Sequence, residues 1–347
     1  MTGASAATLR FIEEPAPQPG ETVPVAPGVH WLRMPLPMKL DHINLWLLED
    51  QGGCVLVDTG MGTQATRDAW LALERGLFRQ HPLRLIVLTH LHPDHVGLAA
   101  WLQQRFGVPV WTSHDTHEQL RTLTREPTPA ELAQRIAQLV HYGLPRTTAD
   151  QLAPMLRFDT YRTDVSGLPQ IERFAAGGEI SRWADRDWHW LATGGHAFGH
   201  LCLHSSAPQD ILIAGDQVLP SMTSNVSLNT MVADPDPLGT YLNDLERLTA
   251  IDRDTLVLPS HGQPFRGLSL RARELRQHHE QRLAKVLAAC TRPLTAVETL
   301  PFLYRREHQG FQLYLALGEA LAHLEYLAAH GRMECSEDGG IRRYLTI

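Results

Sequence analysis

Hydrophobic and polar residues along the chain are arranged in the pattern of an α/β protein. Residues 44–48 (Asn-Leu-Trp-Leu-Leu) and 54–57 (Cys-Val-Leu-Val) form short apolar runs, as buried strands do. The run 84–88 (Arg-Leu-Ile-Val-Leu) has the same character, and helical spacing of apolar residues follows from His95 to Leu102. We therefore predict mostly strands over 29–57 and alternating helices and strands from there to Trp111.

A more polar segment interrupts this alternation between residues 113 and 166. Its pattern is helical, most clearly over 129–140 (Pro-Ala-Glu-Leu-Ala-Gln-Arg-Ile-Ala-Gln-Leu-Val). We interpret the segment as a helical insertion. It could form a lid or wall over a substrate, or it could simply enlarge the scaffold, and the sequence favours neither.

The pattern changes again after His261. An amphipathic helix is predicted over 270–289, a short capped helix over 295–300, and a long helix over 313–329 that ends at Gly331. Residues 332–345 then alternate around Asp338-Gly339-Gly340, which indicates a hairpin. Three helices followed by a hairpin predict a small winged-helix-like domain, for which packing or dimerisation is favoured over DNA binding.

These patterns divide the chain into a loose N-terminal arm (1–20), a main domain (21–267, with the insertion at 113–166) and a C-terminal domain (268–347). The 347 residues are 43% hydrophobic and 20% charged, an ordinary globular composition. We find no apolar run of membrane-spanning length and no signal-peptide pattern. The four scattered cysteines suggest free thiols and a cytoplasmic location: Cys54, Cys202, Cys290 and Cys335.

Candidate chemistry is concentrated directly after the predicted strand 84–88. The segment 89–95 (Thr-His-Leu-His-Pro-Asp-His) places His90, His92, Asp94 and His95 at a strand-to-helix turn. Clustered polar groups at a buried turn are costly unless a metal ion or hydrogen bonds satisfy them. Imidazole with carboxylate suits zinc, iron or manganese better than calcium or magnesium.

Three later strands also end on a potential ligand. Residues 188–192 lead to His196, 211–215 to Asp216, and 255–260 to His261. In α/β folds the carboxyl ends of strands face a common crevice, so these side chains can converge on one site. Alone, Asp216 could cap a helix and His261 could be a loop residue, but the repeated placement favours metal binding.

These motifs resemble the metallo-β-lactamase superfamily: His-x-His-x-Asp-His at 90–95, Gly-His at 195–196, Gly-Asp at 215–216 and Ser-His-Gly at 260–262, with Val-Asp-Thr-Gly at 57–60. The resemblance implies an αβ/βα sandwich with a small C-terminal domain, and two divalent ions per chain, zinc favoured and iron or manganese open. It implies that His90, His92 and His196 hold the first metal and that Asp94, His95 and His261 hold the second. Asp216 would bridge the two metals, and Asp58 and His200 would orient the ligands. For Asp58, a turn-stabilising role is equally open.

The resemblance further implies a hydrolase in which a hydroxide bridged by two metals attacks a small acyl substrate such as a thioester, lactone or ester. Asp94 would orient the nucleophile or take its proton. The alternatives are a phosphodiesterase or endoribonuclease, an oxygen-using iron enzyme, and a non-enzymatic nucleic-acid-binding protein. A true β-lactamase is disfavoured, because those enzymes generally lack a bridging aspartate like Asp216.

Charge helps to order these alternatives. Residues 262–347 carry 12 Lys and Arg against 9 Asp and Glu, which leaves 19 against 29 for the rest of the chain. The acidic main domain disfavours a polyanion, although a cluster of arginines could offset it locally: Arg271, Arg273, Arg276 and Arg282. We therefore expect a small-molecule substrate and no membrane partner. Nucleic acid is disfavoured, and a homodimer through the tail or the insertion stays open.

Overall fold

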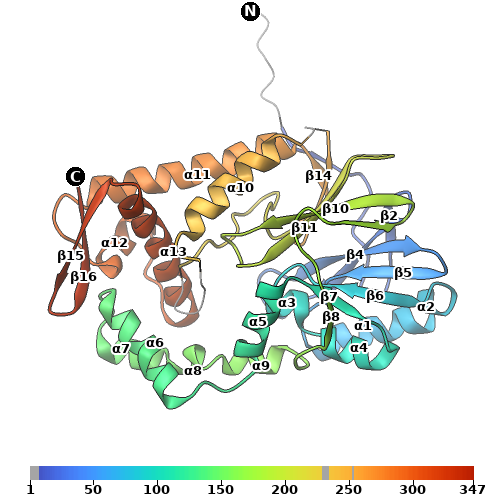
Figure 1. Cartoon of the computed structure of the whole chain (residues 1–347), viewed down its shortest axis with the longest axis horizontal. Coiled ribbons are helices and arrows are strands. Elements are labelled where there is room, and N and C mark those ends of the chain that lie inside the picture. The colour runs from blue at the N-terminus through green and yellow to red at the C-terminus, as the bar shows by residue number, and fades with distance from the viewer. Residues whose placement is uncertain (1–7, 229–233, 252–253) are drawn as a thin grey trace, which may run out of the picture.

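The structure contains two seven-stranded sheets with helices on their outer faces, and these sheets occupy the right half of the view in Figure 1. The structure is a computed structural model that describes residues 8–228, 234–251 and 254–347. The first sheet has, in spatial order, β2 (Val23–Ala26), β3 (Val29–Pro35), β4 (His42–Asp50), β5 (Gly53–Val57), β6 (Leu83–Val87), β7 (Val110–Thr112) and β8 (Ile171–Phe174). The second has β1 (Arg10–Phe11), β14 (Phe265–Arg266), β13 (Leu256–Pro259), β12 (Ile211–Gly215), β11 (His200–Ser205), β10 (Arg186–Thr193) and β9 (Ile180–Trp183).

The strands are apolar on both faces because each sheet is covered on both sides. In β4, Trp46 contributes to the core between the sheets, and its neighbour Leu47 contributes to the core under the outer helices. In β12, Ile213 and Leu212 divide in the same way. Side chains alternate between the faces of a strand, so a strand buried on both faces becomes a continuous hydrophobic run.

The helices complete the predicted sandwich, and the αβ/βα fold is confirmed. Helices α1 (Gln64–Arg75) and α4 (Ala99–Phe106) supply Trp70, Leu73 and Leu102 to the core on the first sheet. Helix α10 (Pro237–Thr249) supplies Tyr241 and Leu245 to the core on the second sheet. Two short helices, α2 (Leu77–Gln80) and α3 (Pro93–Val96), flank β6 in the chain.

Helices also occupy the predicted insertion and the C-terminal region. The insertion contains α5 (His114–Leu123), α6 (Pro129–His141), α7 (Arg146–Gln151), α8 (Ala153–Leu156) and α9 (Asp159–Asp164). The C-terminal region contains α11 (Leu268–Ala289), α12 (Ala296–Leu303), α13 (Gly310–Ala329) and the hairpin β15 (Met333–Asp338) and β16 (Ile341–Thr346). The predicted order of three helices and a hairpin is therefore observed, while the winged-helix classification and the domain boundaries stay predictions.

Two residues of the predicted N-terminal arm pair with the second sheet. Arg10 and Phe11 form β1, which pairs antiparallel with Arg266 and Phe265 of β14 at the edge of the second sheet. A two-residue strand is too short to have a periodic pattern, so the sequence could not indicate it. Residues 1–7 of the predicted arm lie outside the described residues.

Two further observations concern the cysteines and the membrane. Cys54, Cys202 and Cys290 are buried, Cys335 is exposed, and all four are free thiols. Among the described helices, none combines the length and the apolar character that crossing a membrane requires.

Candidate metal centre

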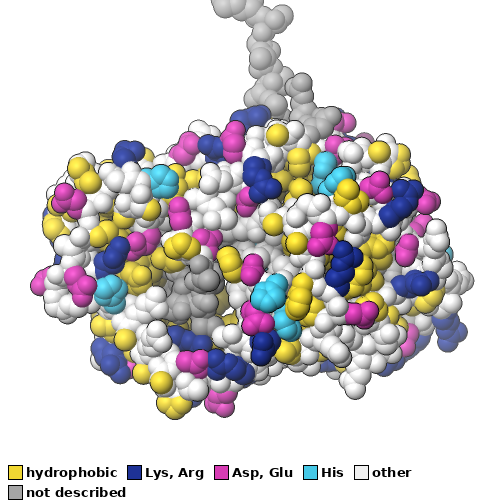
Figure 2. Space-filling view, in the orientation of Figure 1, with side chains coloured by type: hydrophobic (Ala, Val, Ile, Leu, Met, Phe, Trp, Pro, Cys, Tyr) yellow, Lys and Arg dark blue, Asp and Glu magenta, His cyan; other side chains and the backbone are white. Residues whose placement is uncertain are grey.

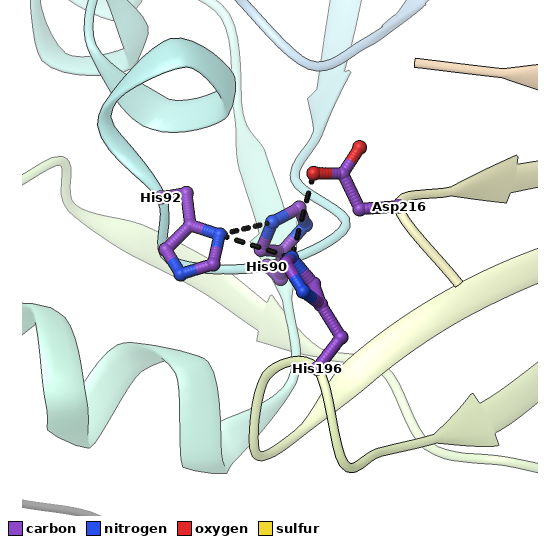
Figure 3. A group of neighbouring side chains, drawn as sticks. All are labelled: His90, His92, His196 and Asp216. Carbon is purple, nitrogen blue, oxygen red and sulfur yellow. Dashed lines mark hydrogen bonds and ion pairs between the residues drawn. The ribbon is translucent and has the colours of Figure 1, made fainter. Parts of the chain in front are cut away.

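The side-chain nitrogens of three histidines lie close together at the carboxyl ends of the strands. His90 and His92 come from the loop after β6, and His196 comes from the loop between β10 and β11. His92 Nδ1 lies 2.9 Å from His90 Nε2 and 3.1 Å from His196 Nε2 (Figure 3). Their nitrogens and a carboxylate oxygen of Asp216 all lie within 4.8 Å of one another.

A second group of potential ligands lies beside the first. It consists of Asp94 and His95 from α3 and His261 from the end of β13. His261 Nε2 is 3.3 Å from Asp94 Oδ2, and His95 Nε2 is 3.8 Å from the same oxygen. The seven predicted ligands therefore form two adjacent groups.

Asp216 lies between the two groups and faces both. Its Oδ2 is 3.4 Å from His196 Nε2 in the first group. Its Oδ1 is 3.6 Å from His95 Nε2 and 3.5 Å from His261 Nε2 in the second. One carboxylate thus offers a separate oxygen to each group.

The direction of the strands explains why distant residues converge. Strands β10 and β12 both pair antiparallel with β11, and β12 pairs parallel with β13, so all three end at the same edge of the sheet. His196, Asp216 and His261 follow these ends. Gly215 is required at this edge, because a Cβ there would lie 2.5 Å from Nε2 of His200.

Asp58 supports the second group from the first sheet. Its Oδ2 lies 2.8 Å from His95 Nδ1 and accepts a hydrogen bond from the Thr89 hydroxyl. Its Oδ1 accepts from the Thr89 backbone N–H at 2.8 Å. Asp58 therefore both holds the turn before His90 and orients the ring of His95, so the two interpretations of this residue are compatible.

Main-chain carbonyls orient two further histidines. His196 Nδ1 donates to the carbonyl of Asn225, and His261 Nδ1 donates to the carbonyl of His42, both at 2.9 Å. The His42 ring adds a contact, because its Nε2 accepts from the Gly262 N–H at 3.0 Å. With Nδ1 protonated, the Nε2 lone pairs of His196 and His261 point into the centre, as metal ligation requires.

His200 lies under the centre rather than in it. The ring is fully buried, and Nε2 accepts a hydrogen bond from the Asp216 backbone N–H at 3.3 Å. Its Nδ1 is 2.8 Å from the Thr193 hydroxyl. His200 thus fixes the backbone that carries Asp216.

Electrostatics differ between the two groups. Burial, followed by the nearby His196, lowers the pKa of His92 to about 3, and burial also holds the pKa of His90 well below its ordinary value. These two imidazoles are therefore neutral near pH 7, with lone pairs available. Neutral imidazole is the form that binds metal ions.

The second group lies in a negative field. Burial opposes the charged form of His261, but Asp216 and then Asp94 outweigh it and raise the pKa of His261 to about 10. For His95, burial is outweighed first by Asp58, so its pKa lies well above the ordinary value. Carboxylates in this arrangement stabilise positive charge, whether it comes from protons or from metal ions.

The residues present fit metal ions chemically. His95 Nε2 and Asp216 Oδ1 are buried and have no hydrogen-bond partner among the described residues. All ion pairs that the described residues make with Asp58, Asp94 and Asp216 are to histidines. Bound cations would satisfy both the orphaned atoms and the excess of carboxylates.

Comparison with known families shows which family the chain belongs to. Residues 38–261 match the family model described as the metallo-beta-lactamase superfamily. The chain belongs to the metallo-beta-lactamase superfamily. Residues 283–347 match a second model, described as a metallo-beta-lactamase-like C-terminal domain.

Individual members resemble the chain over nearly its whole length. A beta-lactamase domain protein from Burkholderia ambifaria is 36% identical, with 98% of each chain covered and a TM-score of 0.87. A metallo-beta-lactamase family protein from Thermus thermophilus is 32% identical, with 93% of this chain and 100% of that chain covered and a TM-score of 0.76. A probable metallo-hydrolase, YqjP, from Bacillus subtilis is 24% identical, with 91% of this chain and 97% of the relative covered.

A cavity of about 870 Å³ opens beside the centre. His92, Asp94 and His196 line one part of it. Other parts are lined by helices of the insertion and by α13 of the C-terminal region. Both the predicted insertion and the predicted C-terminal domain therefore contribute walls to the space beside the two ligand groups.

The sequence pointed to the side chains of the centre but not to all of their supports. The nine predicted site residues lie together, either in the two ligand groups or in contact with them. His42, which belongs to none of the sequence motifs, holds the loop that carries His261. Thr89, Thr193 and Asn225 were not singled out as supports. Asn225 acts through its carbonyl, which every residue has, so no sequence signal identifies it.

Proposed function

We propose that the protein is a binuclear metal-dependent hydrolase that cleaves a small acyl substrate, such as a thioester, lactone or ester. The observation that carries this proposal is the position of Asp216, whose two oxygens face the two ligand groups. His92, Asp94 and His196 of these groups line a cavity. When bound, two divalent ions would supply a water of lowered pKa and positive charge for the oxygen that gains charge. We favour zinc, because imidazole and carboxylate ligands suit it.

Asp94 is the residue we assign to proton transfer. It lines the cavity, and its side chain is 20% exposed, compared with 9% for Asp216. A water between Asp94 and the substrate could give its proton to the carboxylate while its oxygen bonds to the carbonyl carbon. The bond to the leaving oxygen or sulfur then breaks, and Asp94 returns the proton to the leaving group.

The charges around the cavity support an acyl substrate over a phosphodiester. Among the described residues that line the cavity, none is lysine or arginine. Three of the four arginines in the α11 cluster have partners within the chain: Arg271 donates to the carbonyls of Leu219 and Met222, Arg276 pairs with Glu246, and Arg282 pairs with Glu319. Arg273 is exposed. On the face visible in Figure 2, basic and acidic side chains are interspersed. A polyanion entering the cavity would meet no lysine or arginine among the described lining residues.

Metal content and a substrate panel test the proposal together. Purified protein would be analysed for metals and then assayed, zinc-loaded and chelator-treated, with a thioester, a lactone, a phosphodiester and a short RNA. We expect two zinc ions per chain and acyl cleavage that chelation abolishes. Cleavage of RNA or the phosphodiester alone would establish the alternative activity instead. Protein that stays inert after zinc, manganese and iron reconstitution would refute the hydrolase assignment.

A further inference from the structure

The cavity extends well beyond the metal centre. Its walls include Tyr142, Met155 and Phe158 from the insertion, and Phe311 and Leu315 from α13. A volume of about 870 Å³ is far more than a scissile acyl bond needs, and it is in the range of cavities that enclose whole small molecules. The walls must therefore contact a part of the substrate remote from the reaction.

The charges of the cavity lining disfavour anionic substrates. Outside the metal centre, its charged residues are all acidic: Asp115, Glu118, Asp164 and Asp234. An anionic group buried here would lose hydration and meet like charge without a cation to compensate.

Exposed apolar side chains in the cavity indicate what it accepts. Phe311 is 57% exposed and Met38 is 51% exposed, and both line the cavity. Met155, Phe158 and Leu315 continue the apolar lining. Large apolar side chains gathered in a concave site stabilise a ligand by burying apolar surface, which scattered surface residues do not.

The position of α13 is fixed relative to the metal centre. The Gly318 carbonyl accepts a hydrogen bond from the Leu228 N–H at 3.0 Å. A Cβ on Gly318 would lie 3.0 Å from the Cβ of Ser227, so glycine permits this close approach. Asn225, whose carbonyl orients His196, lies two residues before Ser227 in the chain. The C-terminal region is thus connected to a predicted metal ligand through a few residues.

We infer that the substrate carries a bulky apolar group without negative charge, and that α13 and the insertion select it. This inference rests on the proposed acyl hydrolysis, and it assigns the C-terminal region a role in substrate specificity. Phe311 is the specificity residue that the geometry identifies most directly, because it is apolar, exposed and in the cavity wall.

A series of p-nitrophenyl esters tests the inference on the zinc-loaded full chain. We expect kcat/KM to rise roughly two- to four-fold per methylene from acetate to octanoate, as burial of each methylene predicts. The octanoate should exceed the mono-p-nitrophenyl ester of suberate, which ends in a carboxylate at the same length, by at least about ten-fold. A flat length profile, or equal rates for the neutral and anionic chains, would overturn the inference.

Two phenylalanines provide matched variants. Phe311→Arg should lower the ratio of kcat/KM for octanoate to that for acetate about five-fold or more, because it places a cation among the apolar walls. For the same reason it should reduce the ratio of kcat/KM for octanoate to that for the suberate ester. Phe302 on α12 is 52% exposed but does not line the cavity, so Phe302→Arg should behave as wild type. Equal effects of both substitutions, or no effect of Phe311→Arg, would contradict selection by this wall.

A binding measurement separates this inference from the proposed function. If zinc-loaded protein cleaves no ester, acetate included, acyl-ester hydrolysis fails, but the cavity can still be tested by calorimetry. Octanamide should bind more tightly than 7-carbamoylheptanoate, which has the same length and a terminal carboxylate. Equal binding, or tighter binding of the anion, overturns the inference whether or not catalysis is observed.

Discussion

Asp216 and Asp58 are both buried carboxylates in contact with His95, but they have different surroundings. Asp216 offers one oxygen to each ligand group, whereas Asp58 contacts His95 through the ring nitrogen that faces away from the centre. Asp216→Asn should therefore reduce bound zinc from about two ions per chain to about one. Asp58→Asn should keep both ions and lose about 10- to 100-fold in affinity or activity, as loss of an orienting residue does.

Elemental analysis after dialysis against a weak chelator measures this difference. Circular dichroism of both variants is the control for folding, since Asp58 also holds the turn at Thr89. An Asp216 variant with two ions and full activity would show that this carboxylate does not bridge them.

The side chains of the candidate metal centre could be predicted because they are closely spaced in the chain or directly follow predicted strands. His90 to His95 follow a strand at once, and His196, Asp216 and His261 each follow another. The supports were less accessible: His42 acts through its carbonyl and through Gly262, 220 residues away in the chain. Such contacts depend on how the two sheets face each other, which no local pattern encodes.

Helices α11 and α13 pack around a pair of buried histidines. His279 Nδ1 lies 3.2 Å from His323 Nε2, and the carbonyl of Glu319 accepts a hydrogen bond from His323 Nδ1. Burial, followed by the neighbouring His323, lowers the pKa of His279 to about 2, and burial lowers the pKa of His323 to about 4. Both rings stay neutral in the folded protein while the unfolded chain protonates them near pH 6.5.

The pair should make the protein less stable as the pH falls below 6.5. Between pH 6.5 and about 4 the unfolded chain binds more protons, so the free energy of unfolding decreases with falling pH by roughly 1 to 2 kcal/mol per histidine at pH 5. Urea unfolding of wild type and of the double variant His279→Gln, His323→Gln at pH 7 and pH 5 measures this. The double variant should lose less stability between the two pH values.

A surface substitution is the control for this comparison. His330 lies at the end of α13 and is exposed, so His330→Gln should retain the full wild-type dependence. The predicted metal ligands titrate in wild type and variants alike and cancel in the difference. Identical pH dependence in wild type and the double variant would show that the pair does not contribute.

The sequence predicted the helices and strands closely, but it did not predict which other elements they pack against. The prediction of a helix over 313–329 matches α13, and the hairpin falls on β15 and β16. Apolar residues surround most of α13, because Leu324 and Leu327 pack into the core while Phe311 and Leu315 line the cavity. A hydrophobic pattern indicates which residues are buried but not which surface or ligand covers them.

At the scale of the whole molecule, the C-terminal region shares a core with the second sheet. Leu212 of β12 and Tyr241 of α10 belong to the same buried cluster as Leu275 of α11 and Leu324 of α13. The change in pattern after His261 predicts a C-terminal domain, and its boundary stays a prediction. The shared core is not visible in sequence, because a pattern along the chain does not show which elements pack together. We therefore expect the two parts to unfold together.

Differential scanning calorimetry should show one cooperative transition for the full chain, and Leu324→Ala tests how far the coupling extends. Leu324 is completely buried and does not line the cavity, so its truncation should cost about 2 to 5 kcal/mol. Because the core is shared, the whole transition should move to lower temperature, and bound zinc should be released at that lower temperature too.

The control is Phe302→Ala, on the exposed face of α12, which should leave the transition temperature and the temperature of zinc release unchanged. Two resolved transitions, with Leu324→Ala shifting only one and zinc release following the other, would mean that the C-terminal region folds independently of the metal centre.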